Sequence, residues 1–340
     1  MWANGPNPCT QSTQARAKMS TMPLFERITR AHSAIRPQVL VTPLERSRPL
    51  SGALGCEVLL KAEHLQPTGT FKVRGATNKI HVLGEDGRRT GVITASTGNH
   101  GQAVARAGAL AGVPVIVYVA ASTARSKMEA IKGLDAELVV VEGDPLDAEL
   151  QARRRAVEEK RPYISPYNDL DVIAGQGTLG MELIEQAPQL DAVFISVGGG
   201  GLIGGTGTAI KHLRAQTRVV AVWPENSPCL LKALEAGKIV DVAESPTLSD
   251  STAGAVEPGS VTLPICQSVI DQTITVNESQ IAAAMRSIAA AEHWIVEGSA
   301  GVALAGLMKV ADAYRGQKVA VVLCGRNIAL DTFLQAIGRA

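Results

Sequence analysis

Uninterrupted runs of β-branched residues alternate with alanine-rich segments along this chain, and that alternation most constrains its fold. Several runs contain Val and Ile without intervening polar residues, a pattern typical of parallel strands that helices cover on both faces. The strand candidates are 57–61, 91–94, 115–119, 137–141, 192–197, 218–222 and 318–324. Helical segments such as 101–111 and 281–292 lie between them, the second preceded by Asn277 and Gln280 at capping-box spacing. The sequence therefore predicts an α/β fold with parallel-rich sheets flanked by helices.

A chain of 340 residues is long enough for two domains. Residues 91–168 contain three strand–helix units of their own, and we expect them to form a small mobile domain. The remainder, 23–90 plus 169–340, would form a large domain into which the small one is inserted. The polar stretch 1–22 lacks the apolar core of a signal peptide, so we expect a disordered extension there.

The composition excludes several classes of function. The chain is 46% hydrophobic and 19% charged with a net charge of +1, which gives no electrostatic reason to expect a nucleic-acid or membrane partner. It also contains no apolar stretch long enough to cross a bilayer. The five cysteines are scattered without a Cys-x-x-Cys pair, which predicts neither a zinc site nor a disulfide framework and favours a reducing cytoplasm.

Lys72 follows a Thr-Gly-Thr turn and has two apolar neighbours, Phe71 and Val73. A single lysine is normally a solvated surface charge. A partly desolvated lysine, however, has a lowered pKa, and its amine can then act as a nucleophile or base near neutral pH. Lys72 is therefore a candidate catalytic amine.

Four consecutive glycines, Gly198 to Gly201, follow the strand candidate 192–197 and precede a helical segment, 206–213. Glycines allow successive backbone N–H groups to converge on a phosphate at a helix N-terminus, where the helix dipole favours an anion. The run therefore predicts a phosphate site rather than a merely tight turn.

The same run formally matches a dinucleotide-binding pattern through Gly199, Gly201 and Gly204. Glu225 lies near the position expected for a ribose-binding acid. A single match of this kind is weak evidence, and a dinucleotide site would leave the segments around Lys72 and Asn99 unexplained.

The segment 96–102, Ser-Thr-Gly-Asn-His-Gly-Gln, follows another strand candidate and opens a helix. Its hydroxyls and backbone N–H groups would suit a carboxylate. Ser, Thr and Asn are also preferred N-cap residues, so a simple helix cap is the alternative. Further along, Cys324 ends a buried strand candidate, where residues of α/β proteins face the ligand crevice, although a buried Cys is usually inert.

These motifs occur in an order that resembles one family. They are Phe71-Lys72-x-Arg74-Gly75, Ser96-x-Gly98-Asn99-His100, Gly175-Gln176-Gly177-Thr178, the glycine run, Glu297-Gly298-x-Ala300-Gly301 and Cys324-Gly325-x-Asn327. From about residue 23 to 331 the chain is similar to the threonine/serine dehydratases that depend on pyridoxal 5′-phosphate (PLP), the fold-type II group that includes serine racemase. Thr97 and Arg326 look most like the hydroxyectoine-utilisation dehydratases.

The resemblance implies a two-lobed fold with PLP in the cleft between the lobes. It implies that Lys72 forms a Schiff base with PLP and then acts as base at the substrate Cα, that Phe71 packs beside the cofactor, and that Asn99 hydrogen-bonds its 3′-oxygen. The phosphate would be held by Gly198, Gly199, Gly200, Gly201 and Leu202.

The resemblance also implies the remaining roles. Ser96, Thr97 and His100 would line the pocket for the substrate carboxylate, with Thr97 where a racemase has a catalytic Ser. Cys324 would approach the pyridine nitrogen with Glu297 nearby. A thiol, with a reference pKa of about 8.5, is a weak partner for that nitrogen. A neutral partner should favour prompt loss of a β-hydroxyl.

We therefore expect a cytoplasmic, homodimeric dehydratase (ammonia-lyase) that converts a small β-hydroxy amino acid of the threonine, serine or 3-hydroxyaspartate type to a 2-oxo acid and ammonia. The alternatives are an amino-acid racemase, a β-replacement synthase, or a non-catalytic ligand-binding protein on the same fold. The β-branch of Thr97 restricts its side chain and disfavours racemisation.

Two further departures from the family affect the expectations. In serine racemase-like members an acidic pair binds a divalent cation, but the corresponding positions here are Trp223 and Cys229, so we expect no metal. Glu225 is displaced by two positions and is expected to be solvated. Arg326 replaces a Gly, and it could pair with a phosphate, pair with a second substrate carboxylate, or lie on the surface outside the pocket.

Overall fold

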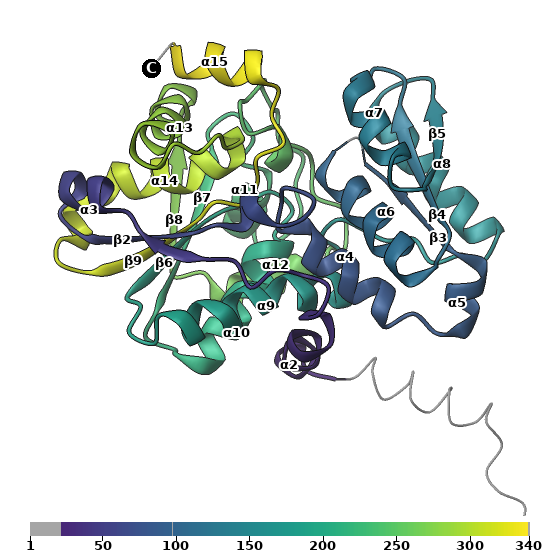
Figure 1. Ribbon diagram of the computed structural model, residues 1–340, viewed down its shortest axis with the longest axis horizontal. Coiled ribbons are helices and arrows are strands. Elements are labelled where there is room, and N and C mark those ends of the chain that lie inside the picture. Colours follow the sequence, from purple (N-terminus) through teal and green to yellow (C-terminus); the bar gives the residue numbers. More distant parts are fainter. Residues whose placement is uncertain (1–21, 97, 339–340) are drawn as a thin grey trace, which may run out of the picture.

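The computed structural model describes residues 22–96 and 98–338, and within them the chain forms two sheets surrounded by helices (Figure 1). The larger sheet has the order β1-β2-β9-β6-β7-β8, and the smaller has the order β3-β4-β5. All neighbouring strands are parallel except β1, which pairs antiparallel with β2. The strands are β1 (Leu44–Arg46), β2 (Glu57–Lys61), β3 (Val92–Ala95), β4 (Val115–Ala120), β5 (Glu137–Val141), β6 (Ala192–Ser196), β7 (Arg218–Pro224), β8 (Gln272–Val276) and β9 (Lys318–Val322).

The helices cover the faces of both sheets. They are α2 (Leu24–Ile35), α3 (Arg48–Leu54), α4 (Lys72–His81), α5 (Glu85–Thr90), α6 (Asn99–Ala111), α7 (Arg125–Lys132), α8 (Pro145–Glu158), α9 (Leu170–Gln186), α10 (Gly201–Leu213), α11 (Cys229–Ala236), α12 (Thr262–Val269), α13 (Glu278–Glu292), α14 (Gly298–Val310) and α15 (Leu330–Gly338), with short 3-10 turns η1 (Glu63–Leu65), η2 (Asp250–Thr252) and η3 (Ala311–Tyr314). None of these helices is long and apolar enough to cross a membrane.

The predicted α/β fold with parallel-rich sheets is confirmed, and each of the seven predicted strands is present. The analysis did not predict β1 and β8, which form the two edges of the larger sheet. Both depart from the continuous apolar pattern: β1 reads Leu-Glu-Arg, and β8 reads Gln-Thr-Ile-Thr-Val with only Ile274 and Val276 buried. An edge strand needs no apolar residues on a face that is left open to solvent.

The small sheet lies entirely within the predicted small domain, 91–168, and the large sheet lies entirely outside it. Figure 1 shows them side by side, the small sheet with α5 to α8 and the large sheet with the remaining helices. The boundaries at 91 and 168, and the mobility of the small domain, stay predictions. Of the extension expected at 1–22, residues 1–21 lie outside the described residues.

A cluster of buried charges joins the large sheet to two helices. Arg74, near the start of α4, donates from Nε to Glu63 Oε2 at 2.7 Å and from Nη1 to Glu182 Oε1 of α9 at 2.7 Å. Lys61, the last residue of β2, contacts Glu182 Oε2 at 2.6 Å. All four side chains are at most 3% exposed, so their charges are balanced by one another rather than by water. The cluster fixes the start of α4 relative to β2 and α9.

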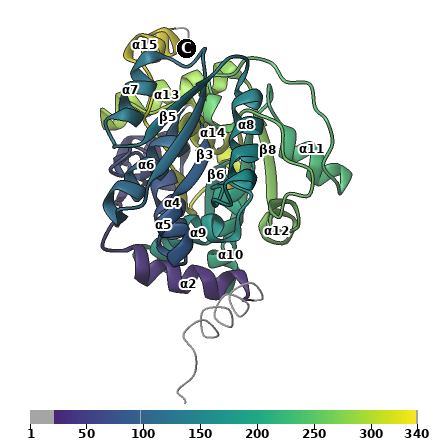
Figure 2. The same cartoon turned by 90° about the vertical axis from the view of Figure 1, so that its right-hand side faces the viewer.

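Helices α9 and α10 pack closely because glycines line their contact, and α2 lies across both of them (Figure 2). A Cβ added at Gly205 would lie 2.2 Å from the carbonyl oxygen of Ile173 and 2.7 Å from the amide nitrogen of Gly177. Neither backbone atom can move away as a flexible side chain would. The glycines therefore allow α9 and α10 to lie closer together than any larger residue would permit.

We expect Gly205→Ala to lower the free energy of unfolding by about 1–3 kcal/mol, because the added methyl group overpacks this contact. Gly52 is the matched control, since it lies in α3 with nothing within 4 Å of its added Cβ. Gly52→Ala should raise stability by about 0.5–1 kcal/mol through helix propensity. Urea denaturation of both variants measures the difference, and equal stabilities would contradict the packing described.

Candidate active site

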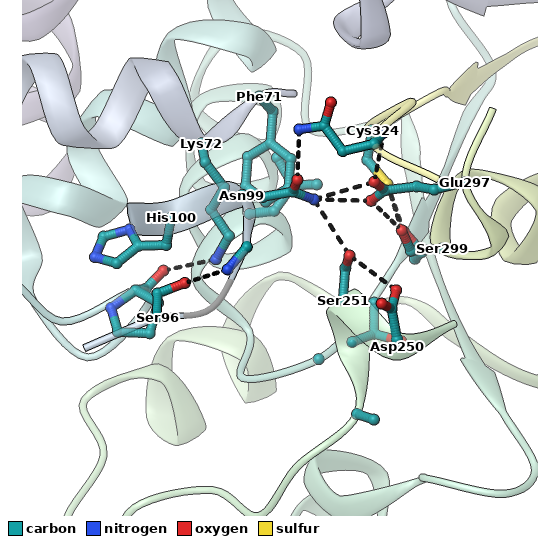
Figure 3. A pocket seen from close by; sticks show the side chains of 18 of the residues that line it. Phe71, Lys72, Ser96, Asn99, His100, Asp250, Ser251, Glu297, Ser299 and Cys324 are labelled. Carbon is teal, nitrogen blue, oxygen red and sulfur yellow. Dashed lines mark hydrogen bonds between the residues drawn. The ribbon is translucent and has the colours of Figure 1, made fainter. Parts of the chain in front are cut away.

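A cavity of about 660 Å³ lies at the carboxyl ends of β3, β6 and β9, between the two sheets. Ser96 directly follows β3, Ser196 ends β6, and Cys324 follows β9 by two residues. Ligands of open α/β sheets bind at this edge, because the loops that follow parallel strands meet there. Figure 3 shows Asn99 and Glu297, which come from the two sides of the cavity, pointing toward each other.

Lys72 is the first residue of α4 and points into the cavity (Figure 3). Its Nζ donates a hydrogen bond to the carbonyl oxygen of Pro166 at 2.9 Å and lies 5.2 Å from the centre of the Phe71 ring. Burial lowers the pKa of the Lys72 amine to about 8, although Cys324 and Glu297 act in the opposite direction. The amine is thus much closer to its neutral, nucleophilic form at neutral pH than a solvated lysine.

The glycine run forms the loop between β6 and α10. Gly200 has a φ of +89°, which favours glycine, and a Cβ at Gly199 would lie 2.4 Å from the ring of Tyr167. Helix α10 begins at Gly201, five residues before the predicted start, and no side chain caps it. Its first N–H groups are therefore available to an anion, and Gly198, Gly199, Gly200, Gly201 and Leu202 all line the cavity.

The dinucleotide alternative receives no support from the structure. Glu225, its expected ribose-binding acid, does not line this cavity. The Glu225 carboxylate is 44% exposed and lies 3.7 Å from the ammonium group of Lys309. This exposure agrees with the expectation that Glu225 is solvated.

Helix α6 begins at Asn99, directly at the cavity, and Gly98 precedes it without a side-chain cap. Among the described residues of this segment, no side chain caps the helix, so the alternative of a simple helix cap is not observed. Ser96 lines the cavity, and its Oγ accepts a hydrogen bond from Gly98 N at 3.3 Å. Thr97 lies outside the described residues.

Asn99 connects the two lobes through both ends of its side-chain amide. Its Nδ2 donates to the carboxylate oxygens of Glu297 at 3.0 and 3.1 Å and to Ser251 Oγ at 3.2 Å. Its Oδ1 accepts from Asn327 Nδ2 at 2.7 Å. Because the amide is engaged in this way, a cofactor oxygen would have to share or displace one of these partners.

His100 is buried, and its ring Nε2 lies 3.1 Å from the carbonyl oxygen of Ile164. A carbonyl can only accept, so Nε2 carries the proton. Burial, together with the nearby Lys72 charge, lowers the pKa of His100 to about 3. The ring is then neutral with Nδ1 as an acceptor, which leaves it no proton to donate to a carboxylate.

Cys324 is buried between two serines. The Ser196 hydroxyl donates to its Sγ at 3.6 Å, and the thiol donates to Ser299 Oγ at 3.5 Å. Burial raises the pKa of the Cys324 thiol to about 12, and the nearby Glu297 carboxylate acts in the same direction. The thiol therefore stays protonated and neutral. Burial likewise raises the pKa of Glu297, which precedes α14.

The structure brings together every described residue that the sequence predicted for the site: Phe71, Lys72, Ser96, Asn99, His100, the glycine run, Leu202, Glu297 and Cys324. The sequence analysis missed others. Tyr167 covers the glycine loop, and Asp250, Ser251 and Thr252 line the cavity from η2. Lys127 of α7 faces Asp250 at 3.5 Å. None of these belongs to a local motif, so only the tertiary fold identifies them.

These residues fit PLP. Three helix N-termini without side-chain caps, those of α6, α10 and α14, surround the cavity and favour anions such as a phosphate and a carboxylate. Lys72 supplies an amine with a lowered pKa for a carbonyl group, and Cys324 supplies a neutral partner for a ring nitrogen. A Cβ at Gly198 or Gly200 would lie less than 3 Å from neighbouring protein atoms, so the glycines let this loop pack closely at the cavity.

Comparison with known proteins agrees with this fit. A protein-family model described as pyridoxal-phosphate dependent enzyme matches residues 35–325. The chain belongs to this family. It is 37% identical over 316 residues to L-threonine ammonia-lyase of Thermotoga maritima, which covers 93% of this chain and 78% of that protein. It is 32% identical over 316 residues to L-threo-3-hydroxyaspartate ammonia-lyase of Saccharomyces cerevisiae, covering 93% and 97%.

Among solved structures, the chain is similar to the processed form of threonine deaminase isoform 2 from Solanum lycopersicum. The TM-score is 0.90 at 31% sequence identity, with 93% of each chain covered. The dehydratase family, the PLP cofactor and the lyase class that were predicted from the sequence are confirmed.

We expect the Lys72 amine of the cofactor-free protein to react with acetic anhydride at a rate that rises with pH and levels off above about pH 8, because burial lowers its pKa. Lys79 is the internal control, since Asp169 at 2.7 Å and Asp171 at 3.0 Å raise its pKa. The acetylation rate of Lys79 should still be rising at pH values where that of Lys72 is constant. Pulse labelling with peptide mass spectrometry measures both lysines, and a common titration would contradict the assignment.

The expected absence of a divalent metal remains a prediction. Among the described residues no group of three or more His, Cys, Asp or Glu side chains could hold an ion. The predicted positions Trp223 and Cys229 are both buried, and neither is a carboxylate. We expect EDTA to leave the melting temperature and the activity of the holoenzyme unchanged. A chelator-dependent loss of either, restored by Mg²⁺ or Ca²⁺, would reverse this prediction.

Proposed function

We propose that this protein catalyses β-elimination on a small β-hydroxy amino acid through the residues of this cavity. The observation that carries the proposal is the Lys72 amine, buried with a lowered pKa beside three uncapped helix N-termini. A non-catalytic binding protein would have no need to hold a lysine in this state. The ammonia-lyase names of two relatives support the same reaction.

PLP, when bound, supplies an electron-accepting ring that stabilises negative charge at the substrate Cα. Lys72 would hold the cofactor and then accept the proton from Cα, because its amine is poised near its lowered pKa. The N–H groups at the start of α10 would hold the phosphate, with Gly198, Gly199, Gly200, Gly201 and Leu202 around it.

The substrate carboxylate would bind at the N-terminus of α6. Ser96 and the N–H groups that begin this helix line the cavity there, and the helix dipole favours an anion. We assign His100 a positioning role, because its neutral ring donates to Ile164 and cannot donate to the substrate. Thr97 remains the candidate second acid–base group, as its place in the resemblance implies.

Cys324 and Asn99 would face the cofactor ring, with Glu297 behind them. Because the Cys324 thiol stays protonated, it provides only a neutral partner for the ring nitrogen. A neutral partner withdraws fewer electrons than a carboxylate-held pyridinium. This would favour departure of the β-hydroxyl, and so elimination over racemisation.

The net reaction balances without any further reactant. The amino acid loses the Cα proton and the β-hydroxide, which together make one water molecule. In the unsaturated amine that is released, the nitrogen loses a proton and Cβ gains one; water then adds at Cα, and ammonia leaves. The products are a 2-oxo acid and ammonia.

The homodimer and the cytoplasmic location are part of the same proposal. Four cysteines in the described part of the chain are free and buried, which suits a reducing compartment. Light scattering coupled to size-exclusion chromatography would distinguish the dimer from a monomer. Detection of the protein in a secreted fraction would contradict the location.

We expect the holoenzyme to release ammonia from at least one of L-threonine, L-serine and L-threo-3-hydroxyaspartate, and Lys72→Ala to lower that rate by at least a thousandfold, because the base is lost. Lys238→Ala, an exposed lysine outside the cavity, is the matched control and should keep the parent rate.

Full activity in Lys72→Ala would refute the assigned role of the amine. Chiral chromatography of the remaining substrate provides the second readout. Inverted amino acid without ammonia would favour the racemase alternative, and a strict need for a second nucleophile would favour the β-replacement synthase.

A further inference from the structure

Arg326 is a cation at the active-site cavity that the proposed chemistry does not use. It lines the cavity two residues after Cys324, and its side chain is exposed. Among residues 22–96 and 98–338, its guanidinium has no hydrogen-bond or ion-pair partner. Five N–H donors and a full positive charge are therefore free at the edge of the site.

The backbone holds Arg326 next to the loop that carries Lys72. Its amide donates to Gly69 O at 3.0 Å, and the adjacent residues Gly325 and Thr70 form an antiparallel bridge. A Cβ at Gly69 would lie 3.3 Å from Arg326 Cγ, so the side chain starts directly against this loop. The position of the Arg326 backbone is thus fixed relative to the catalytic amine.

The neighbouring titratable group does not neutralise this charge. His64 is buried beside Trp294, with 4.7 Å between the ring centres, and neither of its ring nitrogens has a hydrogen-bond partner among the described residues. Burial, together with the Arg326 charge, lowers the pKa of His64 to about 4, so the imidazole is neutral at physiological pH. An imidazole is either neutral or cationic, so His64 provides no counter-charge for Arg326 in either state.

Other charged side chains that line the cavity have partners within the protein. Lys127 faces Asp250 at 3.5 Å, and Glu297 accepts hydrogen bonds from Asn99 and Asn327. In the proposed function the phosphate binds at α10 and the substrate α-carboxylate binds at α6. The cofactor phosphate and the α-carboxylate that every substrate of this reaction carries therefore each have a site without Arg326.

We propose that Arg326 is a specificity-determining residue that binds a second carboxylate, carried on the Cβ of the substrate. The preferred substrate class is then a β-hydroxy amino dicarboxylic acid of the 3-hydroxyaspartate type rather than threonine or serine. This inference rests on the proposed function, since it concerns the same cavity and the same reaction.

The chemistry of the two groups supports this assignment. A guanidinium binds a carboxylate through two parallel N–H···O bonds, which fix its orientation as well as its charge. A methyl or hydrogen substituent would leave the guanidinium beside an apolar group and would gain nothing from it. The exposed location at the cavity edge also allows a charged product to leave without breaking a buried ion pair.

The test compares kcat/KM for L-threo-3-hydroxyaspartate and L-threonine in the parent holoenzyme, Arg326→Gln and Arg326→Lys. We expect Arg326→Gln to reduce the ratio of the two values by about tenfold to a hundredfold, the size of a lost hydrogen bond to a charged group. Arg326→Lys keeps the charge and loses the two-point contact, so its ratio should fall between those of the parent and Arg326→Gln. Arg89→Gln, which removes an exposed charge outside the cavity, is the control and should keep the parent ratio.

Three results would overturn the inference. An unchanged ratio would mean that Arg326 lies outside substrate recognition. An equal loss for both substrates would mean that it binds the α-carboxylate. Loss of PLP absorbance from Arg326→Gln at cofactor concentrations that saturate the parent would mean that it binds the phosphate.

A binding measurement separates failure of this inference from failure of the proposed function. L-Aspartate and L-2-aminobutyrate differ in the β-carboxylate and have no β-hydroxyl to lose. Calorimetric titration of the holoenzyme should give tighter binding of L-aspartate, and Arg326→Gln should abolish that preference. If the parent protein eliminates neither hydroxy amino acid but shows this Arg326-dependent preference, the proposed reaction fails and the carboxylate site stands. Equal affinities in both proteins would refute the site whatever the activity.

Discussion

The buried guanidinium of Arg74 is the interaction on which the geometry of the site depends. It lies two residues after Lys72 and contacts carboxylates from η1 and α9, while Lys61 at the end of β2 shares one of them. Removing one partner from such a buried pair costs about 3–5 kcal/mol, because the other charge stays uncompensated. An apolar cluster of similar volume could be equally stable, but it would not fix the direction of α4 through several directional bonds. The charges therefore set the position at which Lys72 enters the cavity.

Helix N-termini then determine the electrostatics of the cavity. Helices α6, α10 and α14 begin at its wall without side-chain caps, so their dipoles make the site attractive to anions. One acidic side chain of the protein itself, Glu297, is buried there, and its oxygens accept hydrogen bonds from Asn99, Asn327 and Ser299. Because Asn99 belongs to α6, this carboxylate also links the lobe of the small sheet to that of the large sheet. A cofactor that hydrogen-bonds Asn99, as proposed, would therefore couple its binding to the relative position of the lobes.

Local patterns in the sequence predicted most of the fold and the centre of the site. Strands buried on both faces have continuous apolar runs, and the capping box of Asn277 and Gln280 marked the start of α13 correctly. The edge strands β1 and β8 were missed because one side of each is open to solvent. The predicted start of α10 was late because glycine disfavours helix interiors, whereas here the last glycine of the run forms the first turn that faces the cavity.

The residues that escaped prediction share a different property, since their roles depend on contacts distant in sequence. Tyr167 reaches the glycine loop across more than thirty positions, and η2 reaches the cavity from a segment without any motif. The protonation of His100 likewise follows from its contact with Ile164, which no spacing rule could supply. Sequence patterns identify residues that act through the backbone of their own segment. Residues that act through tertiary packing require the structure.

In the proposed function, the loop after β9 separates catalysis from specificity. Cys324 is buried between Ser196 and Ser299, while Arg326 is exposed and lacks a partner among the described residues. The backbone between them is held by Gly69 and Thr70, so a change of side chain at position 326 need not disturb Cys324. The substrate substituent can therefore be selected by a side chain whose backbone is fixed by the catalytic loop itself. If Arg326 selects the substituent as proposed, a change at this position would alter the substrate preference and leave the catalytic residues in place.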